Sequence, residues 1–115
     1  MIYNFMYKVY LISSGDIDKQ YKIGFTRREV KERLKEFKTG NSNTLEIVSV
    51  FESKWGTKIE AILHRRYRNF QIDGEWFNLD EKQVKEFYQD CKRQHDLFEL
   101  VNNHNTYVIE RGGLK

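Results

Sequence analysis

The chain has 115 residues, of which 39% are hydrophobic and 15% aromatic, enough for the core of one domain. Its net charge of +3 permits a nucleic-acid partner without requiring one. The single cysteine, Cys91, excludes an intrachain disulfide and a multi-cysteine zinc site, and it favours a reducing, cytoplasmic environment. No apolar run is long enough to span a membrane, and the N-terminus lacks the pattern of a signal peptide.

The first third of the chain predicts a hairpin followed by a helix. Strong β formers predict strands over residues 5–13 and 20–26, and the turn-forming residues between them, 14–18, join the two strands. Residues 28–38 predict an amphipathic helix, which Gly40-Asn41 would end.

The middle of the chain predicts a strand, a helix and a turn. Residues 45–52 are rich in leucine, isoleucine and valine and predict a third strand. Residues 57–69 predict a second helix. Asp73-Gly74 is typical of a turn, and residues 75–78 predict a possible short strand after it.

The last part of the chain predicts a third helix. Asp80 begins it, Gln83 stands in the capping-box position, and the helix continues to about residue 96 or beyond. The pattern after residue 102 is ambiguous, and residues 106–109 are compatible with an edge strand.

The order β-β-α-β-α-(β)-α predicts a small α/β sandwich, in which helices pack on a mostly antiparallel sheet. We expect one domain over residues 1–115, with its core at about 5–95 and a tail at about 96–115.

Polar residues interrupt the apolar pattern of the first two strands. Strand residues alternate between faces, so Tyr10 and Lys22 can share one face while Tyr21 lies on the other. Gly24 has no side chain, which would let a substrate approach the backbone. Spacing alone favours ordinary strand residues for both, with Tyr10 half-buried and Lys22 solvated, because tyrosines and lysines are common on strands.

The first predicted helix places Arg33 beside its apolar stripe of Val30, Leu34 and Phe37. From there a guanidinium could reach a phosphate, or it could lie over the edge of the core.

On the second predicted helix, Glu60 lies at the margin of the buried stripe and His64 follows one turn later. Such a pair can share a metal ion or a hydrogen bond, and a lone carboxylate suits Mg²⁺. The alternative is two neighbouring side chains on the helix surface.

Basic residues follow His64 along the same helix and precede it at the helix start. They could contact a phosphate backbone or form a solvated face: Lys54, Lys58, Arg65, Arg66 and Arg68.

Taken together, these residues resemble the GIY-YIG nuclease superfamily, and in particular its phage-type subgroup. The resemblance covers roughly residues 7–88 and rests on an ordered set of short motifs. These motifs are Val9-Tyr10, Tyr21-Lys22-Ile23-Gly24-Phe25-Thr26, Arg33-Leu34, Glu60, Leu63-His64, Phe70 and Gly74-Glu75-Trp76-Phe77.

The resemblance implies a three-stranded antiparallel sheet flanked by helices, and hydrolysis of DNA phosphodiesters that depends on Mg²⁺ or Mn²⁺. Tyr10 matches the tyrosine that takes part in activating the nucleophile, Arg33 the arginine that stabilises the phosphate, and Glu60 the single metal-binding carboxylate. His64 is a further candidate catalytic residue beside Glu60.

The sequence departs from this pattern at the second motif, where Lys22 takes the place of a tyrosine. Lys22 could act as the base, and the choice among Tyr10, Tyr21 and Lys22 for handling the proton stays open. Phe37 stands where many members carry a histidine, and Lys8 replaces a glycine.

The expected partner is DNA, most simply double-stranded, with a homodimer or a separate targeting partner as further possibilities. The residues expected to contact nucleic acid are Arg27, Arg28, Lys58, Arg65 and Arg68. The third helix and tail offer a minimal DNA-reading surface through Lys82, Lys85, Lys92 and Arg93. The alternative function is a catalytically silent nucleic-acid-binding or protein-interaction module on the same fold.

Overall fold

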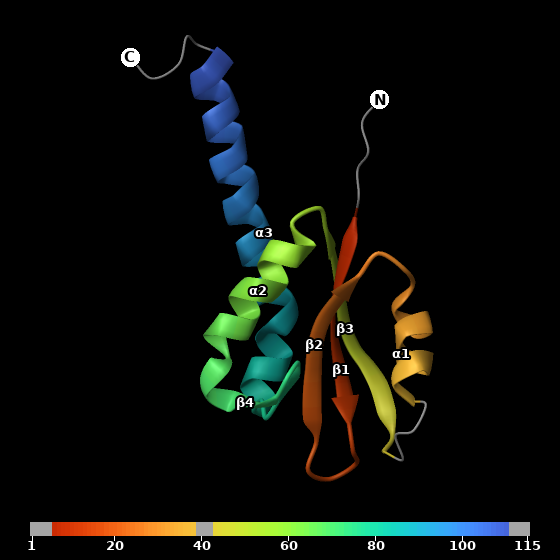
Figure 1. The fold of residues 1–115 in the computed structure, drawn as a ribbon. Helices are drawn as coiled ribbons and strands as arrows, with labels where there is room; N and C mark the ends of the chain where they lie inside the picture. The colour runs from red at the N-terminus through yellow and green to blue at the C-terminus, as the bar shows by residue number, and fades with distance from the viewer. Residues whose placement is uncertain (1–5, 39–42, 111–115) are drawn as a thin grey trace.

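The computed structural model describes residues 6–38 and 43–110, which form an antiparallel sheet with helices on both faces (Figure 1). In chain order the elements are β1 (Tyr7–Ser14), β2 (Gln20–Thr26), α1 (Val30–Lys38), β3 (Leu45–Ser53), α2 (Gly56–Arg66), the 3-10 helix η1 (Arg68–Phe70), β4 (Gln71–Asp73), β5 (Trp76–Phe77) and α3 (Glu81–Glu110). The predicted α/β class is therefore confirmed. Phe5 and the predicted helix end at Gly40-Asn41 lie outside the described residues.

The sheet has five strands in the order β3-β1-β2-β5-β4, and each neighbouring pair is antiparallel. The predicted three-stranded sheet is wrong, because residues 71–77 turn back on themselves and add a hairpin to β2. Gly74 makes this turn with φ of +54°, and the Gln71 side-chain amide donates to the Gly74 carbonyl at 2.6 Å. The sequence does not predict β4, because Gln71 and Asp73 are polar and give no pattern of β-forming residues.

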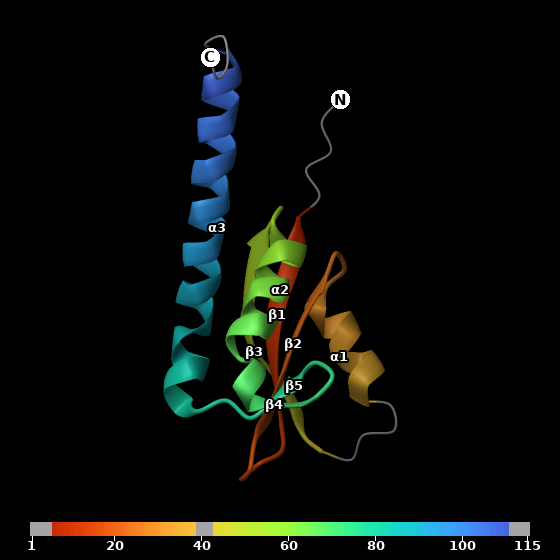
Figure 2. The same cartoon turned by 60° about the vertical axis from the view of Figure 1, so that its left-hand side comes forward.

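The two faces of the sheet carry separate cores. Helices α2 and α3 lie on one face and α1 on the other, as the two views show (Figures 1 and 2). The core under α2 and α3 contains Val9, Leu11, Ile23, Phe51, Ile59, Leu63, Tyr67, Phe77, Leu79, Phe87 and Cys91. The core under α1 contains Tyr10, Ile12, Val30 and Leu45, with Leu34 and Phe37 packed against it. Alternation along β1 sends neighbouring residues to these two cores.

The second helix ends earlier than its apolar pattern predicts. α2 stops at Arg66, and residues 68–70 continue as the 3-10 helix η1. The apolar stripe of the predicted helix is Ile59, Ile62, Leu63, Tyr67 and Phe70. Ile59, Leu63 and Tyr67 are buried, but Phe70 is 42% exposed because the change of helix type rotates it away from the core.

The third helix begins with the predicted capping box. The Asp80 backbone N–H donates to Gln83 Oε1 at 2.8 Å, and the Gln83 N–H donates to Asp80 Oδ1 at 2.7 Å. α3 then continues to Glu110, so the edge strand over residues 106–109 is wrong. No proline or glycine interrupts the chain between Asp80 and Glu110, which lets the helix override the local β-forming pattern. Among the described residues, no helix combines the length and apolar character of a membrane span.

Candidate functional site

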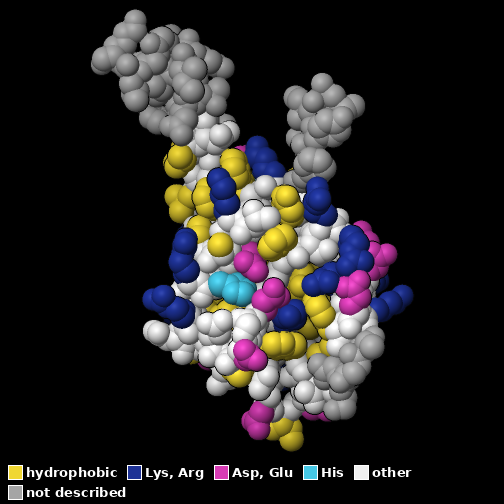
Figure 3. All heavy atoms as spheres, viewed as in Figure 1, with side chains coloured by type: hydrophobic (Ala, Val, Ile, Leu, Met, Phe, Trp, Pro, Cys, Tyr) yellow, Lys and Arg dark blue, Asp and Glu magenta, His cyan; other side chains and the backbone are white. Residues whose placement is uncertain are grey.

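A group of polar side chains lies where β5 stops pairing with β2. The two strands pair only at Tyr21 with Phe77 and Lys22 with Trp76, and the Ile23 N–H then donates to the Glu75 carbonyl at 3.0 Å. Beyond this point β2 continues to Thr26, flanked by α1 on one face of the sheet and α2 on the other. Figure 3 shows histidine, acidic and basic side chains together at the middle of this surface. We call Tyr10, Lys22, Arg33, Glu60, His64 and Glu75 the polar cluster.

Tyr10 is held inside the cluster by its neighbours on the sheet and on α1. It is 1% exposed, and it lies opposite Gly24 in the register of β1 and β2. A Cβ atom on Gly24 would come within 2.7 Å of Tyr10 Cζ, so only glycine leaves room for this ring. The Arg33 guanidinium donates a hydrogen bond to the Tyr10 hydroxyl.

Burial raises the pKa of Tyr10; its hydrogen bond with Arg33 partly opposes this, and the negative charges of Glu75 and Glu60 add to it. The hydroxyl therefore keeps its proton at neutral pH. This favours Tyr10 as a group that donates a hydrogen bond and orients a bound molecule, rather than as a base.

Lys22 lies on the same face of the sheet as Tyr10, as the alternation predicts. Its side chain is 14% exposed, and its Nζ lies 4.7 Å from the ring centroid of Phe37 and 5.3 Å from that of Trp76. The same Nζ lies 3.2 Å from Glu75 Oε1. Lys22 is thus a largely buried cation with one carboxylate beside it.

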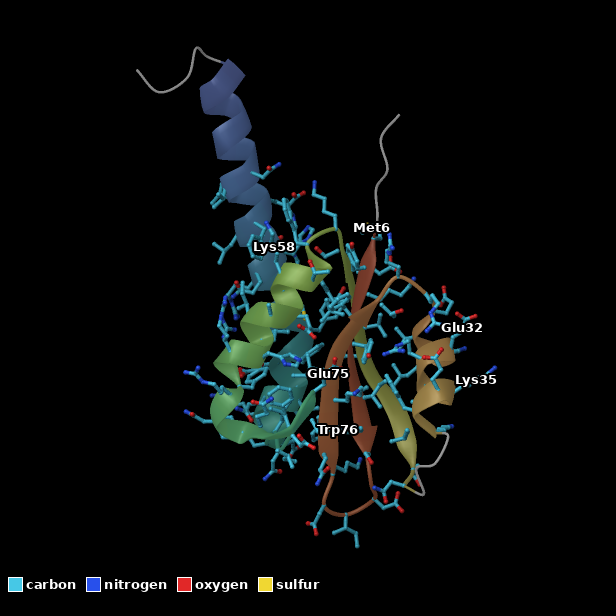
Figure 4. All side chains as sticks on the ribbon, in the orientation of Figure 1. Met6, Glu32, Lys35, Lys58, Glu75 and Trp76 are labelled. Carbon is cyan, nitrogen blue, oxygen red and sulfur yellow. The ribbon has the colours of Figure 1, made fainter. Side chains whose placement is uncertain are left out.

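Arg33 has two kinds of neighbour. Besides Tyr10, it contacts Glu36, whose Oε1 lies 2.6 Å from Arg33 Nη1, and its guanidinium lies 4.7 Å from the Phe37 ring centroid. Its side chain is 31% exposed, so one part of the guanidinium faces solvent while another part faces the cluster. Glu32 and Lys35 point away from the sheet, as the helical pattern predicts (Figure 4).

Glu60 and His64 reach the cluster from α2. His64 Nε2 lies 2.8 Å from the Ile23 carbonyl oxygen and 3.3 Å from Glu60 Oε2. Both neighbours are acceptors, so Nε2 must carry a hydrogen and donate it. This arrangement contradicts a shared metal ion bound through that nitrogen. His64 instead connects α2 to β2 and holds Glu60 in place.

The Glu60 side chain is 14% exposed. Burial raises the pKa of this carboxyl; His64 partly opposes the rise, and the nearby negative charge of Glu75 adds to it. Mg²⁺ binds proteins through one or two carboxylates and completes its coordination with water and substrate phosphates. Glu60 fits this pattern, although no three His, Cys, Asp or Glu side chains gather into a metal site within residues 6–38 and 43–110.

Tyr21 does not belong to the cluster. Its side chain packs against the core under α2 and α3, on the face of β2 opposite to Lys22. Its candidacy for handling the proton is therefore wrong, because alternation along the strand points it away from Tyr10.

The expected nucleic-acid contacts lie around the cluster on several elements, and Figure 3 shows basic side chains distributed around this face. The Arg27 guanidinium lies 5.9 Å from the Tyr7 ring centroid, and Arg28 Nη2 lies 2.8 Å from Glu36 Oε2. Lys58, near the start of α2, lies 5.4 Å from the ring centroid of Trp55. Arg65 and Arg68 are exposed near the other end of α2.

Trp55 is partly buried, packs against the larger core and stacks on Phe98, with 5.6 Å between ring centroids.

The basic residues of α3 are less suited to a phosphate backbone than the sequence predicts. Three of them form ion pairs within α3, at 3.0, 3.1 and 2.7 Å: Lys85 with Glu81, Lys92 with Asp96, and Arg93 with Asp90. Arg66 likewise lies 3.7 Å from Asp90, which also accepts a 2.7 Å hydrogen bond from the Tyr67 hydroxyl. These contacts join α2 to α3.

Glu75 is the member of the cluster that residue-by-residue reasoning missed. It stands in the short motif Gly74-Glu75-Trp76-Phe77, whose residues turn the chain and pack against β2. The available signal was a charged residue directly before two aromatic residues, of which Phe77 is buried and Trp76 half-buried. Its side chain is brought to Lys22 by the pairing of β5 with β2, which the sequence did not predict.

Comparison with known proteins identifies the family. Residues 7–92 match the T5orf172 domain, which covers most of the chain. The chain is also 28% identical over 91 residues to "Putative KilA-N domain-containing protein 315L" of Invertebrate iridescent virus 6, covering 72% of this chain and 38% of that relative. The chain thus spans less than two fifths of the relative's length. No solved structure matches the chain.

These matches correct the resemblance to the GIY-YIG superfamily, which was wrong as a family assignment. The motifs behind it are short, and the packing of strands and helices dictates several of their residues, such as Val9, Ile23 and Phe77. The five-stranded sheet also differs from the three strands that the resemblance implied. The matching family covers residues 7–92 and so includes every member of the polar cluster: the chain belongs to the T5orf172 domain family.

Proposed function

We propose that this domain binds DNA across the surface that carries the polar cluster. The family match and the viral relative are compatible with a DNA-binding module. The observation that carries the proposal is the position of two cations around Tyr10, where β5 stops pairing with β2: Arg33 hydrogen-bonds the Tyr10 hydroxyl, and Lys22 lies on the same face of the sheet. Amino and guanidinium groups held in place can donate hydrogen bonds to phosphate oxygens of DNA. The basic residues around the cluster can contact further phosphates.

Fluorescence anisotropy with a labelled DNA duplex, at several salt concentrations, tests this proposal. Each phosphate contact that is lost should reduce the slope of log K against log salt by about 0.9. We expect Arg33→Ala and Arg65→Ala to weaken binding and lower this slope. Lys85→Ala is the matched control, because Lys85 is already paired with Glu81 on α3. DNA affinity that neither Arg33→Ala nor Arg65→Ala changes would contradict binding at this surface.

We further propose a second, finer function, metal-assisted hydrolysis of the bound phosphodiester. The specific observation that favours it is a largely buried carboxylate, Glu60, in the same cluster as the hydrogen-bonded pair Tyr10 and Arg33. Mg²⁺ or Mn²⁺ held by Glu60 would supply charge at the scissile phosphate. Arg33 would stabilise the charge that develops on the phosphate, and Tyr10 would orient the attacking water.

A plasmid-nicking assay with Mg²⁺ or with EDTA separates binding alone from hydrolysis. We expect nicking that requires the metal and that is lost in Glu60→Ala. Binding that persists without any nicking would leave the catalytically silent module as the function. Nicking by a rigorously pure Glu60→Ala protein would contradict the role of this carboxylate.

A further inference from the structure

The carboxylate of Glu75 occupies the space that a phosphate would need in order to reach Lys22. Figure 4 places Glu75 near β2, between α2 and α1. Its Oε1 lies 3.2 Å from Lys22 Nζ, and it also lies 3.0 Å from the position that a Cβ atom on Gly24 would take. Glu75 therefore lies beside Gly24 together with the Tyr10 ring, which fills the space that the sequence left open for a substrate backbone.

This carboxylate is poorly satisfied where it lies. Glu75 Oε1 is buried, yet among the described residues it has no partner with hydrogen-bond geometry, so Lys22 attracts it as a charge alone. A buried carboxylate oxygen ordinarily accepts hydrogen bonds, and leaving it without one costs free energy. The negative charge of Glu75 also acts on Tyr10 and Glu60. An anion with better hydrogen bonds could replace it at little cost.

The connection of Glu75 to the fold allows such a replacement. Its backbone carbonyl accepts from the Ile23 N–H, which fixes the main chain, while its side chain is 42% exposed. Rotation about the side-chain bonds can therefore move the carboxylate into solvent without breaking the sheet.

We propose that Glu75 is an internal competitor that holds Lys22 in the free protein and is displaced by a backbone phosphate of DNA. This inference rests on the proposed DNA binding and adds a residue that limits its affinity. The effect of Glu75 on DNA affinity distinguishes a competitor from a purely structural partner of Lys22. A structural partner would support binding, whereas a competitor opposes it.

The test compares Glu75→Gln with Glu81→Gln in the anisotropy assay with a DNA duplex. Both changes remove one negative charge, but Glu81 pairs with Lys85 on α3, outside the cluster. We expect Glu75→Gln to tighten binding roughly threefold to fivefold, as for release of a partly exposed ion pair, and Glu81→Gln to change it much less. Lys22→Gln in the Glu75→Gln background should abolish the gain.

Glu75→Asp keeps the charge but shortens the side chain, so we expect a smaller gain; it serves as the second variant if circular dichroism shows that Glu75→Gln does not fold. Affinity of Glu75→Gln equal to or below that of Glu81→Gln, with the wild-type protein binding DNA, would overturn the inference and leave the proposed function intact. If neither the wild-type protein nor any variant bound DNA, both would fall.

Discussion

The face of the sheet under α2 and α3 differs from the face under α1 in what the side chains do. Under α2 and α3, large apolar residues such as Leu63 and Phe87 are fully buried in one cluster. Under α1 the buried cluster of described residues is small, and it includes the hydroxyl-bearing ring of Tyr10 next to Lys22 and Arg33. Most of the apolar burial therefore lies under α2 and α3, whereas the buried part of the α1 face carries Tyr10, Lys22 and Arg33 of the polar cluster, so the two faces can be perturbed separately.

The largest expected effect is a loss of stability on the α2/α3 face. Leu63→Ala should lower the free energy of unfolding by about 2–5 kcal/mol, because Leu63 is 0% exposed. The same change at half-buried Leu34 on α1 should cost only about 1 kcal/mol. Guanidinium unfolding followed by circular dichroism measures both, and equal losses would break the comparison between the faces.

The next effect concerns function on the α1 face. Arg33→Ala should slow nicking by about 100-fold or more, because it removes a donor to Tyr10 and to the phosphate, while changing the free energy of unfolding by less than about 1 kcal/mol. Arg93→Ala is a matched control, since Arg93 also pairs with a carboxylate, Asp90, but lies on α3 outside the cluster. A large stability loss in Arg33→Ala would assign this arginine to structure instead.

A smaller effect is expected where α2 meets α3. Tyr67→Phe removes the 2.7 Å hydrogen bond to Asp90 and should lower the free energy of unfolding by about 1–2 kcal/mol. Asp90 keeps its ion pair with Arg93, which limits the loss. Tyr88→Phe, at a tyrosine that is 46% exposed, should leave urea unfolding nearly unchanged. If the two variants unfold alike, the α2–α3 contact does not depend on this hydroxyl.

The smallest effect is a pH dependence at Glu60, between the two faces. Burial raises the pKa of this carboxyl in the folded protein, so folding favours its protonated form. Glu60 does not lower the free energy of unfolding below the ordinary glutamate pKa. It lowers this free energy increasingly as the pH rises through the raised pKa of the folded protein. Unfolding curves from pH 4 to 7 should therefore show Glu60→Gln gaining stability relative to the wild-type protein as the pH rises. A constant difference would contradict the raised pKa.

Local patterns predicted the elements whose signals are contained in a few consecutive residues. The Asp80–Gln83 capping box is confirmed because it depends on two residues three positions apart. Tyr10 and Lys22 share one face, as predicted, because the two strands of the hairpin pair in the simplest way. Of the β4–β5 hairpin, the turn at Asp73-Gly74 and the short strand after it were predicted. Strand β4 was missed because polar Gln71 and Asp73 give no strand pattern, and pairing with β5 supplies what propensity lacks.

The cluster was only partly predictable for the same reason. Tyr10, Lys22, Arg33 and Glu60 were named from the sequence, but their contacts depend on register and on the crossing of helices over the sheet. His64 was expected to share a metal ion or a hydrogen bond with Glu60. Its Nε2 hydrogen is instead donated to the backbone carbonyl of Ile23, which is far away in the sequence and could not be anticipated from the helix alone. Glu75 entered only through a pairing between residues far apart in the chain.

The reactivity of the Cys91 thiol can report how often α3 separates from the sheet. The thiol is 0% exposed on the face that joins α3 to the sheet, and burial, reinforced by Asp90, raises its pKa to about 12. It is the single cysteine of the chain, so a disulfide reagent can react with the protein at no other residue. The rate of that reaction would therefore follow how often α3 separates from the sheet, and it would do so without any introduced label.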